Sequence, residues 1–474
     1  EEVPDSSISR VDLTSKSFVT IDGKSAKDFD DALYAEETSS GFKLFVSIAD
    51  VSEYVKKNSS LDIEALNRGT SIYFRNKVIP MLPELLSNGR CSLNPNEKKY
   101  TITCVIDLTK DAEIKDYEFC ESIITSKARL TYEGLGPLFS KPKNKLDKKI
   151  ETSLNNLEKI YRALKLKRKR RNSIEFNLSE TRPISDKANR ILKFSRMDRN
   201  EYHGVVEECM ILANICAANF LLRRKIPTIF RFHEKPDLSK ITDLKEFLSS
   251  RGFKKNMKSS NYRSSILSWL EESKKTKFEE IINLQILRSM KLAKYDSSHS
   301  DHFALALDKY CHFTSPIRRY ADLVVHRGIK GYLREHIKSN DSSFLYNKNE
   351  EYNLMKFQWL ARENEKKQIN LILQSHEKNH QELWDKWSKK NPSPEYVSNS
   401  DIERRPKYDL EYNFKSWLYK IAVNESLNTL KKIRVFEEYD ENIHCLLYTS
   451  PSTRDQRGYG MPSVCLKKKI GGGG

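Results

Sequence analysis

The sequence has no long hydrophobic run, which argues against a membrane-spanning protein. A transmembrane helix needs about 20 apolar residues, and no uninterrupted apolar run of about 18 residues appears in the 474 residues. A secretory leader is also not visible, because the opening EEVPDSSISR is acidic and polar. We therefore expect a protein that has no membrane partner.

The chain also lacks the cysteine pairs that are typical of zinc sites and redox motifs. Its 8 cysteines are scattered, and no two of them form a C-x-x-C. Most lie in apolar surroundings, which favours buried thiols over disulfides or metal ligands. The residues read in this way are Cys91, Cys104, Cys120, Cys209, Cys216 and Cys311. Reduced, buried cysteines are typical of a cytoplasmic protein, and we expect that location.

The chain has fewer acidic than basic residues. The chain has 83 Lys and Arg against 65 Asp and Glu, a net charge of +18. Such an excess favours a polyanionic partner such as a nucleic acid. A basic solvated surface would explain the charge equally well, so composition alone leaves both explanations open.

Hydrophobic periodicity predicts strands in the first third of the chain and mostly helices after about residue 150. In the first predicted helix, Leu61, Ile63 and Leu66 are expected to share one face. The predicted strands lie in residues 17–55, 101–108 and 119–132, and the predicted helices are 59–75, 154–171, 205–225 and 315–333. The pattern indicates a mixed α/β (α+β) fold with a sheet core, enclosing helices and a helical or irregular C-terminal tail.

Composition divides the chain into three parts. We predict a main domain over residues 1–380, then a linker and an amphipathic helical segment over 381–444. Within that segment, FKSWLYKIAVNESLNTLKKIR loosely resembles a helix of bacterial sigma factors. Residues 445–474 read as a non-native or disordered tail, which we exclude from fold reasoning.

The most informative stretch is TIDGKSAKDFDDALY, in which four acids alternate with apolar residues. The apolar neighbours indicate an acidic cluster held against the core, where burial and mutual repulsion would raise the carboxyl pKa values. A hard divalent cation such as Mg²⁺ relieves both effects. A solvated acidic turn explains the residues equally well. The acids are Asp22, Asp28, Asp30 and Asp31, and the apolar neighbours are Ile21, Phe29 and Ala32.

This stretch resembles the opening of the RNB domain, the catalytic domain of the ribonuclease II and ribonuclease R family. The resemblance runs in family order through IADVSEYV, VIPMLPELLSNGRCSLNP, VVEECMILAN, IPTIFRFHEKPD and YCHFTSPIRRYADLVVHR. It implies a magnesium-dependent hydrolase, with Mn²⁺ as a possible substitute, that shortens single-stranded RNA from its 3′ end and releases nucleoside 5′-monophosphates. It further implies two-metal-ion catalysis by a monomer. The flanking OB-fold barrels of the family have no visible counterpart.

The resemblance also implies roles for individual residues. Asp22, Asp28, Asp30 and Asp31 match metal-binding acids, and Asp30 matches the acid on which the chemistry most depends. Arg318 matches the arginine on the scissile phosphate, a task that suits the guanidinium fork. Neighbouring residues of a helix point about 100° apart, so we expect Arg319 to serve elsewhere than the scissile phosphate. We place it among the RNA-binding residues.

Four further residues match the RNA channel of the family. Tyr73 and Phe176 match aromatic side chains that hold the terminal nucleotide from two sides, where stacking accepts any base. Tyr132 and Glu207 match residues that contact the ribose, although Glu208 is adjacent to Glu207. Judged without the resemblance, the three aromatic residues are better explained as ordinary core residues.

Two alternatives remain open at this point. The chain could be a non-catalytic RNA-binding protein that keeps the RNB fold, although its intact acids argue against this. A sigma-like transcription factor would rest on the one C-terminal helix. One departure concerns the late helix WLARENEKKQINLIL, where Asn370 and its neighbours are neutral and leave one family carboxylate unassigned.

Overall fold

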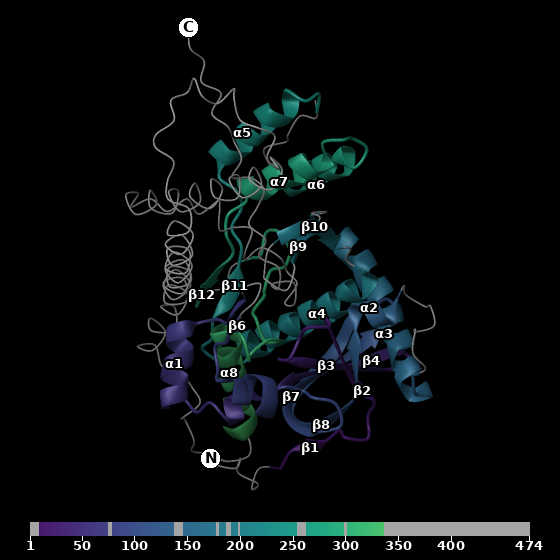
Figure 1. Cartoon of the computed structure of the whole chain (residues 1–474), viewed down its shortest axis with the longest axis vertical. Coiled ribbons are helices and arrows are strands. Elements are labelled where there is room, and N and C mark those ends of the chain that lie inside the picture. Colours follow the sequence, from purple (N-terminus) through teal and green to yellow (C-terminus); the bar gives the residue numbers. More distant parts are fainter. Residues whose placement is uncertain are drawn as a thin grey trace, which may run out of the picture. The chain divides into compact units, whose positions relative to one another are not determined.

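The centre of the fold is a six-stranded sheet, shown in Figure 1. The computed structural model describes residues 9–73, 78–136, 146–176, 180–185, 191–197, 200–253, 262–297 and 301–335. The strands of the central sheet are β1 (Val11–Asp12), β2 (Phe18–Asp22), β3 (Asp31–Thr38), β4 (Gly41–Ala49), β7 (Lys98–Thr109) and β8 (Ile114–Thr131).

The long strand β8 closes this sheet on itself. The strand order is β1-β8-β2-β3-β4-β7, and β7 pairs again with β8. The first part of β8 pairs antiparallel with β7, from Ile114 to Thr125. Its last part, from Ser126 to Thr131, pairs parallel with β2. Both ends of the β2–β3–β4–β7 order therefore hydrogen-bond to the same strand.

Side chains alternate between two hydrophobic clusters along the strands, because successive residues point to opposite faces. Val19 and Leu33 belong to the first cluster, together with residues of α3 (Lys148–Arg170) and α4 (Glu201–Arg223). Their neighbours Phe18 and Ala32 belong to the second cluster, together with residues of α8 (Tyr320–Glu335). The sheet is thus covered on both faces, which accounts for the nearly continuous apolar runs in its strands.

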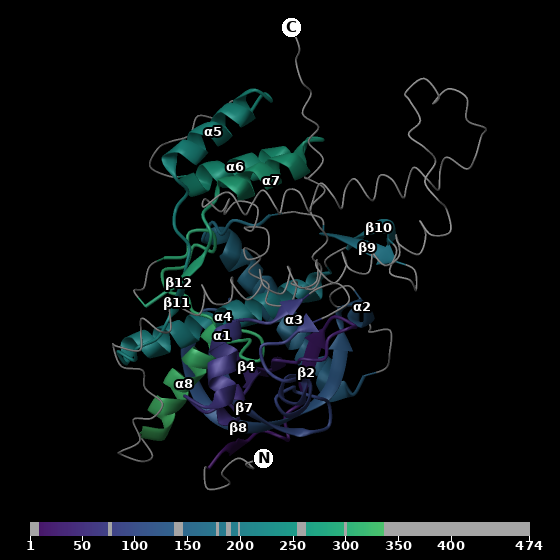
Figure 2. The same cartoon turned by 60° about the vertical axis from the view of Figure 1, so that its left-hand side comes forward.

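The remaining elements surround this centre or form small units of their own (Figures 1 and 2). A third hydrophobic cluster, which includes Trp269, holds three helices together. Those helices are α5 (Leu238–Ser249), α6 (Tyr262–Ser273) and α7 (Glu279–Ser289). The other elements are η1 (Val51–Glu53), α1 (Ser60–Arg68), η2 (Leu85–Arg90), α2 (Tyr132–Leu135) and the strand pairs β5 (Ile72–Tyr73)/β6 (Val78–Ile79), β9 (Glu180–Ser185)/β10 (Ile191–Met197) and β11 (Phe230–Phe232)/β12 (Lys294–Asp296).

Helix α4 is a core helix with an apolar composition. Among the described residues it is the one helix long and apolar enough to cross a membrane by length and composition alone. Of its most apolar window, 83% is buried inside the protein. Cys209, Ala213 and Ala217 in α4 are fully buried in the first cluster. The predicted buried helix over 205–225 is therefore confirmed.

The predicted mixed fold with a sheet core is confirmed, but two local predictions are wrong. Helix α1 ends at Arg68, and Ile63 is 54% exposed, while Asp62 and Ala65 of the same helix are buried. Helix α8 begins at Tyr320, so Ser315 and its followers form a turn before it. The three-part division of the chain stays a prediction, because residues 336–474 lie outside the described residues.

Candidate active site

The four predicted acids lie in the segment 22–31, which connects the end of β2 to the start of β3. We call this segment the acidic loop. Asp22 is the last residue of β2 and Asp31 is the first residue of β3. These strands are antiparallel neighbours, so the last residue of β2 and the first residue of β3 lie at the same end of the strand pair. Asp22, Asp30 and Asp31 are buried, and Asp28 is half-buried.

Two residues that the sequence did not single out hold the acidic loop in place. Ser92, fully buried, accepts a hydrogen bond from Phe29 N at 3.0 Å and donates one to Lys27 O at 2.8 Å. Arg129 donates to Lys24 O at 2.7 Å, and its guanidinium lies 5.1 Å from the centre of the Phe29 ring. Hydrogen bonds therefore hold the loop backbone to Ser92, which follows η2, and to Arg129 in β8.

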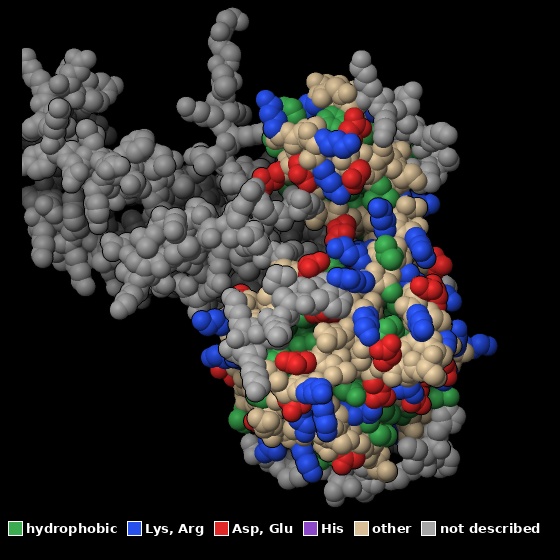
Figure 3. Space-filling model, turned by 90° about the vertical axis from the view of Figure 1, so that its right-hand side faces the viewer, with side chains coloured by type: hydrophobic (Ala, Val, Ile, Leu, Met, Phe, Trp, Pro, Cys, Tyr) green, Lys and Arg blue, Asp and Glu red, His purple; other side chains and the backbone are tan. Residues whose placement is uncertain are grey.

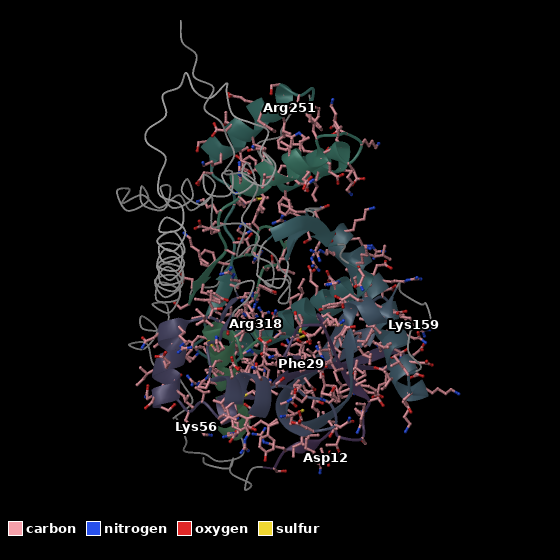
Figure 4. All side chains as sticks on the ribbon, in the orientation of Figure 1. Asp12, Phe29, Lys56, Lys159, Arg251 and Arg318 are labelled. Carbon is pink, nitrogen blue, oxygen red and sulfur yellow. The ribbon has the colours of Figure 1, made fainter. Side chains whose placement is uncertain are left out.

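Asp30 meets the turn that precedes α8. Its Oδ1 accepts the Ile317 N–H at 2.8 Å, and its Oδ2 lies 3.6 Å from Arg318 Nε. The Arg318 guanidinium also donates to Ser315 Oγ at 3.1 Å. Figure 4 labels Arg318 and Phe29, two residues from these distant parts of the chain. Both predicted catalytic residues, Asp30 and Arg318, thus lie in one buried site.

The charges around Asp30 suit a cation. Burial raises the pKa of the Asp30 carboxyl well above its ordinary value, although the charge of Arg318 opposes this. The negative charges of Asp28 and Asp31 act in the same direction as burial. A divalent ion would stabilise the ionised form, and Mg²⁺ prefers oxygen ligands of this kind. The donor chemistry of the acidic loop therefore fits magnesium.

Arg319 points to a different partner from that of Arg318. It binds Asp322 in a bidentate pair, with both N–O distances 2.7 Å. Asp322 Oδ1 also accepts the Ser315 N–H at 2.8 Å. The two arginines diverge within a turn and not around a helix, so the helical argument used for them in the sequence does not apply. An RNA contact by Arg319 stays a prediction.

Comparisons with known proteins identify the family of this chain. A family model described as "RNB domain" matches residues 10–335. The chain belongs to the RNB domain family. Ribonuclease R of Escherichia coli (strain K12) is 41% identical over 334 residues, which cover 70% of this chain and 41% of that protein. Ribonuclease R of Vibrio parahaemolyticus is 40% identical over 334 residues, with 70% and 40% covered.

Solved structures also match the fold of this chain. Mycoplasma genitalium RNase R in complex with ribose methylated single-stranded RNA matches with a TM-score of 0.70 and 33% sequence identity. The match covers 76% of this chain and 56% of that one. The predicted RNB-type fold is therefore confirmed. This chain spans about two fifths of the length of the curated relatives named above.

The RNB domain places the two predicted ribose-contacting residues on or beside α4. The Tyr132 ring stacks on His203, with ring centroids 3.7 Å apart. Arg168 Nη1 lies 2.8 Å from Glu207 Oε1 and 2.7 Å from Glu208 Oε1. Both glutamates contact the same arginine at similar distances. The choice of Glu207 over Glu208 therefore rests on the resemblance.

The remaining predicted channel residues differ in their surroundings. Tyr73 donates its hydroxyl proton to Asp28 Oδ2 at 2.7 Å, so it lies at the acidic loop. Phe176 is partly buried and packs against the third hydrophobic cluster. His326, a tempting general base, is fully buried, and its Nε2 donates to Phe313 O at 2.7 Å. A buried histidine bonded to the backbone in this way has a structural role.

A second acidic cluster lies in the RNB domain and already contains cations. Asp50, Glu53 and Glu121 are buried, and each offers a carboxylate oxygen within 4.8 Å of the others, close enough to share a metal ion. Lys330 Nζ lies 2.6 Å from Asp50 Oδ2 and also contacts Glu53. Arg10 and Arg334 join the same carboxylates. We call these six residues the ion-pair cluster.

The surface view in Figure 3 shows Lys and Arg side chains mixed with Asp and Glu over the described face. The basic end of α3 follows this pattern, since Lys167 pairs with Glu113 at 2.8 Å. Interspersed charges of both signs are typical of a solvated surface. The excess of positive charge is therefore not gathered into one basic patch on that face.

Proposed function

We propose that this chain is a 3′-to-5′ hydrolytic exoribonuclease that degrades single-stranded RNA to nucleoside 5′-monophosphates. The observation that carries the proposal is the buried contact of Asp30 with Ile317 N–H and Arg318, next to further acids. Membership of the RNB domain family and the RNA-bound relative from Mycoplasma genitalium support the same activity.

In this proposal the residues divide the work by their chemistry. Arg318 donates charge-assisted hydrogen bonds to the scissile phosphate, and Asp30 holds the Arg318 side chain in place. Asp22, Asp28, Asp30 and Asp31 would hold two magnesium ions, which supply a Lewis acid at the phosphate and a water of lowered pKa. Water adds to phosphorus, the P–O3′ bond breaks, and the 3′ oxygen of the shortened chain takes up a proton.

RNA selection is assigned to the aromatic and acidic residues of the channel. Tyr73 and Phe176 would stack on the terminal nucleotide, which needs no particular base. Tyr132 and Glu207 would contact the ribose. Arg319 is kept in this group as a prediction, although its pairing with Asp322 favours a structural role. We also propose a cytoplasmic monomer, and light scattering after gel filtration tests the oligomeric state.

The test is cleavage of a 3′-labelled single-stranded RNA in the presence of Mg²⁺. A labelled mononucleotide should appear at the start of the reaction, and the same RNA labelled at its 5′ end should shorten stepwise. Short labelled fragments of mixed length would indicate internal cleavage and contradict the proposal. RNA binding with no product at any metal concentration would favour the alternative, a non-catalytic RNA-binding RNB-fold protein.

A further inference from the structure

The segment Gly69–Tyr73 lies between the two halves of the candidate site. At one end, Gly69 O accepts the Tyr320 N–H at 2.9 Å. In its middle, Thr70 Oγ1 and Ser71 N both donate to the carbonyl oxygen of Arg318, at 2.9 and 3.0 Å. The backbone of Arg318 is therefore tied directly to this segment.

At the other end, the same segment reaches the acidic loop. Tyr73 donates to Asp28 Oδ2 at 2.7 Å, and the tyrosine is only 8% exposed. A short bond from a buried hydroxyl restricts the rotation of a half-buried carboxylate. Five consecutive residues thus connect the backbone of Arg318 with the side chain of Asp28.

We propose that the Tyr73 hydroxyl is a positioning group for Asp28, in addition to any contact between the Tyr73 ring and RNA. The inference rests on the proposed function, in which Asp28 is a metal-holding acid. An outer partner of a ligating carboxylate fixes its orientation, and losing such a partner typically costs about 10–100-fold in metal affinity or activity. The ring and the hydroxyl of Tyr73 would then have separable roles.

Tyr73→Phe removes the hydroxyl and keeps the ring. Binding of Mn²⁺ without RNA, followed by electron paramagnetic resonance, should weaken by about tenfold, while the shortest RNA fragment left after digestion stays the same. Tyr73→Ala should change both. The matched control is Tyr34→Phe, which removes a hydroxyl bonded to Glu36 Oε2 at 3.0 Å, away from the acidic loop. It should leave Mn²⁺ binding unchanged.

A double variant tests whether the effect passes through Asp28. In an Asp28→Ala background, which has no acceptor for the Tyr73 hydroxyl, Tyr73→Phe should cause no further loss of Mn²⁺ affinity, because interacting groups are not additive. Equal losses in both backgrounds, or wild-type affinity in Tyr73→Phe, would overturn the inference while RNA cleavage by the wild-type chain still stands. A wild-type chain that neither binds Mn²⁺ nor cleaves RNA would overturn the proposed function as well.

Discussion

Asp30 and Asp50 are both buried carboxylates that contact cationic side chains from the last described part of the chain, yet their pKa values move in opposite directions. Burial raises the pKa of Asp30 well above its ordinary value. Burial also acts on Asp50, but the charges of Lys330 and Arg10 outweigh it and lower the pKa of that carboxyl. The two acidic clusters therefore differ in how far cationic side chains of the protein neutralise their negative charge.

The contacts explain the difference. Lys330 Nζ lies 2.6 Å from Asp50 Oδ2, whereas Arg318 Nε lies 3.6 Å from Asp30 Oδ2. The ion-pair cluster matches three acids with three cationic side chains. Clustered acids are thus evidence for a metal only after the cations of the chain have been counted. We expect a metal at the acidic loop and none at the ion-pair cluster.

The largest effect should come from Asp30→Asn. The substitution keeps the shape of the side chain and removes its charge, so hydrolysis should stop while RNA binding stays close to that of wild type. Cleavage and filter binding of the same oligonucleotide measure the two properties. EDTA should stop the wild-type reaction, and Mg²⁺ or Mn²⁺ should restore it. A variant that retains more than about a tenth of the wild-type rate, against the loss expected when a site charge is removed, contradicts the assignment.

Lys330→Met should affect stability instead. It leaves buried Asp50 and Glu53 without their shared ammonium group, and breaking a buried pair costs about 3–5 kcal/mol in the free energy of unfolding. Urea denaturation measures this, and the cleavage rate of the folded protein should stay near wild type. Lys56→Met is the control, because Lys56 also contacts Glu53 but is 49% exposed. If Lys330→Met changed the metal dependence of cleavage, the ion-pair cluster would belong to the active site.

Arg318→Ala should mainly reduce the cleavage rate, whereas Arg319→Ala should mainly reduce the stability of the fold. Loss of the Arg318 contact with the phosphate should slow cleavage by about a hundredfold, or ~3 kcal/mol. Arg319→Ala should mainly lower the melting temperature, because it leaves the buried Asp322 carboxylate without its bidentate partner. Cleavage rates at saturating RNA and thermal melts decide between them. The opposite ranking of rates would show that Arg319 is the phosphate-binding residue.

The smallest effect concerns acid pH. Burial acts to raise the pKa of Glu53, but Lys330 lowers it to about 2. The unfolded chain then binds more protons than the folded one as pH falls toward and below the ordinary Glu value of 4.5. The stability contributed by Glu53 is fully present above that pH and is lost as pH falls toward about 2. Urea unfolding between about pH 5 and pH 3 should show a steeper loss for wild type than for Lys330→Met.

Much of the fold could be predicted because strand and helix periodicity is local. The strands within residues 17–55 and 101–108, and the apolar helix α4, were predicted from the sequence. The buried face of α1 was not, since Asp62 is buried by its pairing with Arg327, which lies 265 residues away. A helical pattern of apolar residues cannot reveal a buried acid whose partner is so distant.

The candidate site shows the same limit. The acidic loop was recognised from its residues, and the resemblance added Arg318 and Tyr73. The hydrogen bond from Tyr73 to Asp28 and the support of the loop by Ser92 and Arg129 depend on tertiary contacts that no spacing rule contains. The motif IADVSEYV was noticed as a family signature, but the pairing of its acids with Lys330 was not.

The separation of Asp30 and Ile317 along the chain, 287 residues, has a consequence for synthesis on the ribosome. At about 5–20 residues per second, roughly 15–60 s pass between the emergence of the acidic loop and the emergence of the turn that covers it. During that interval the nascent chain has its acids but lacks Arg318. The proposed active site is therefore incomplete while most of the RNB domain, residues 10–335, is still being translated.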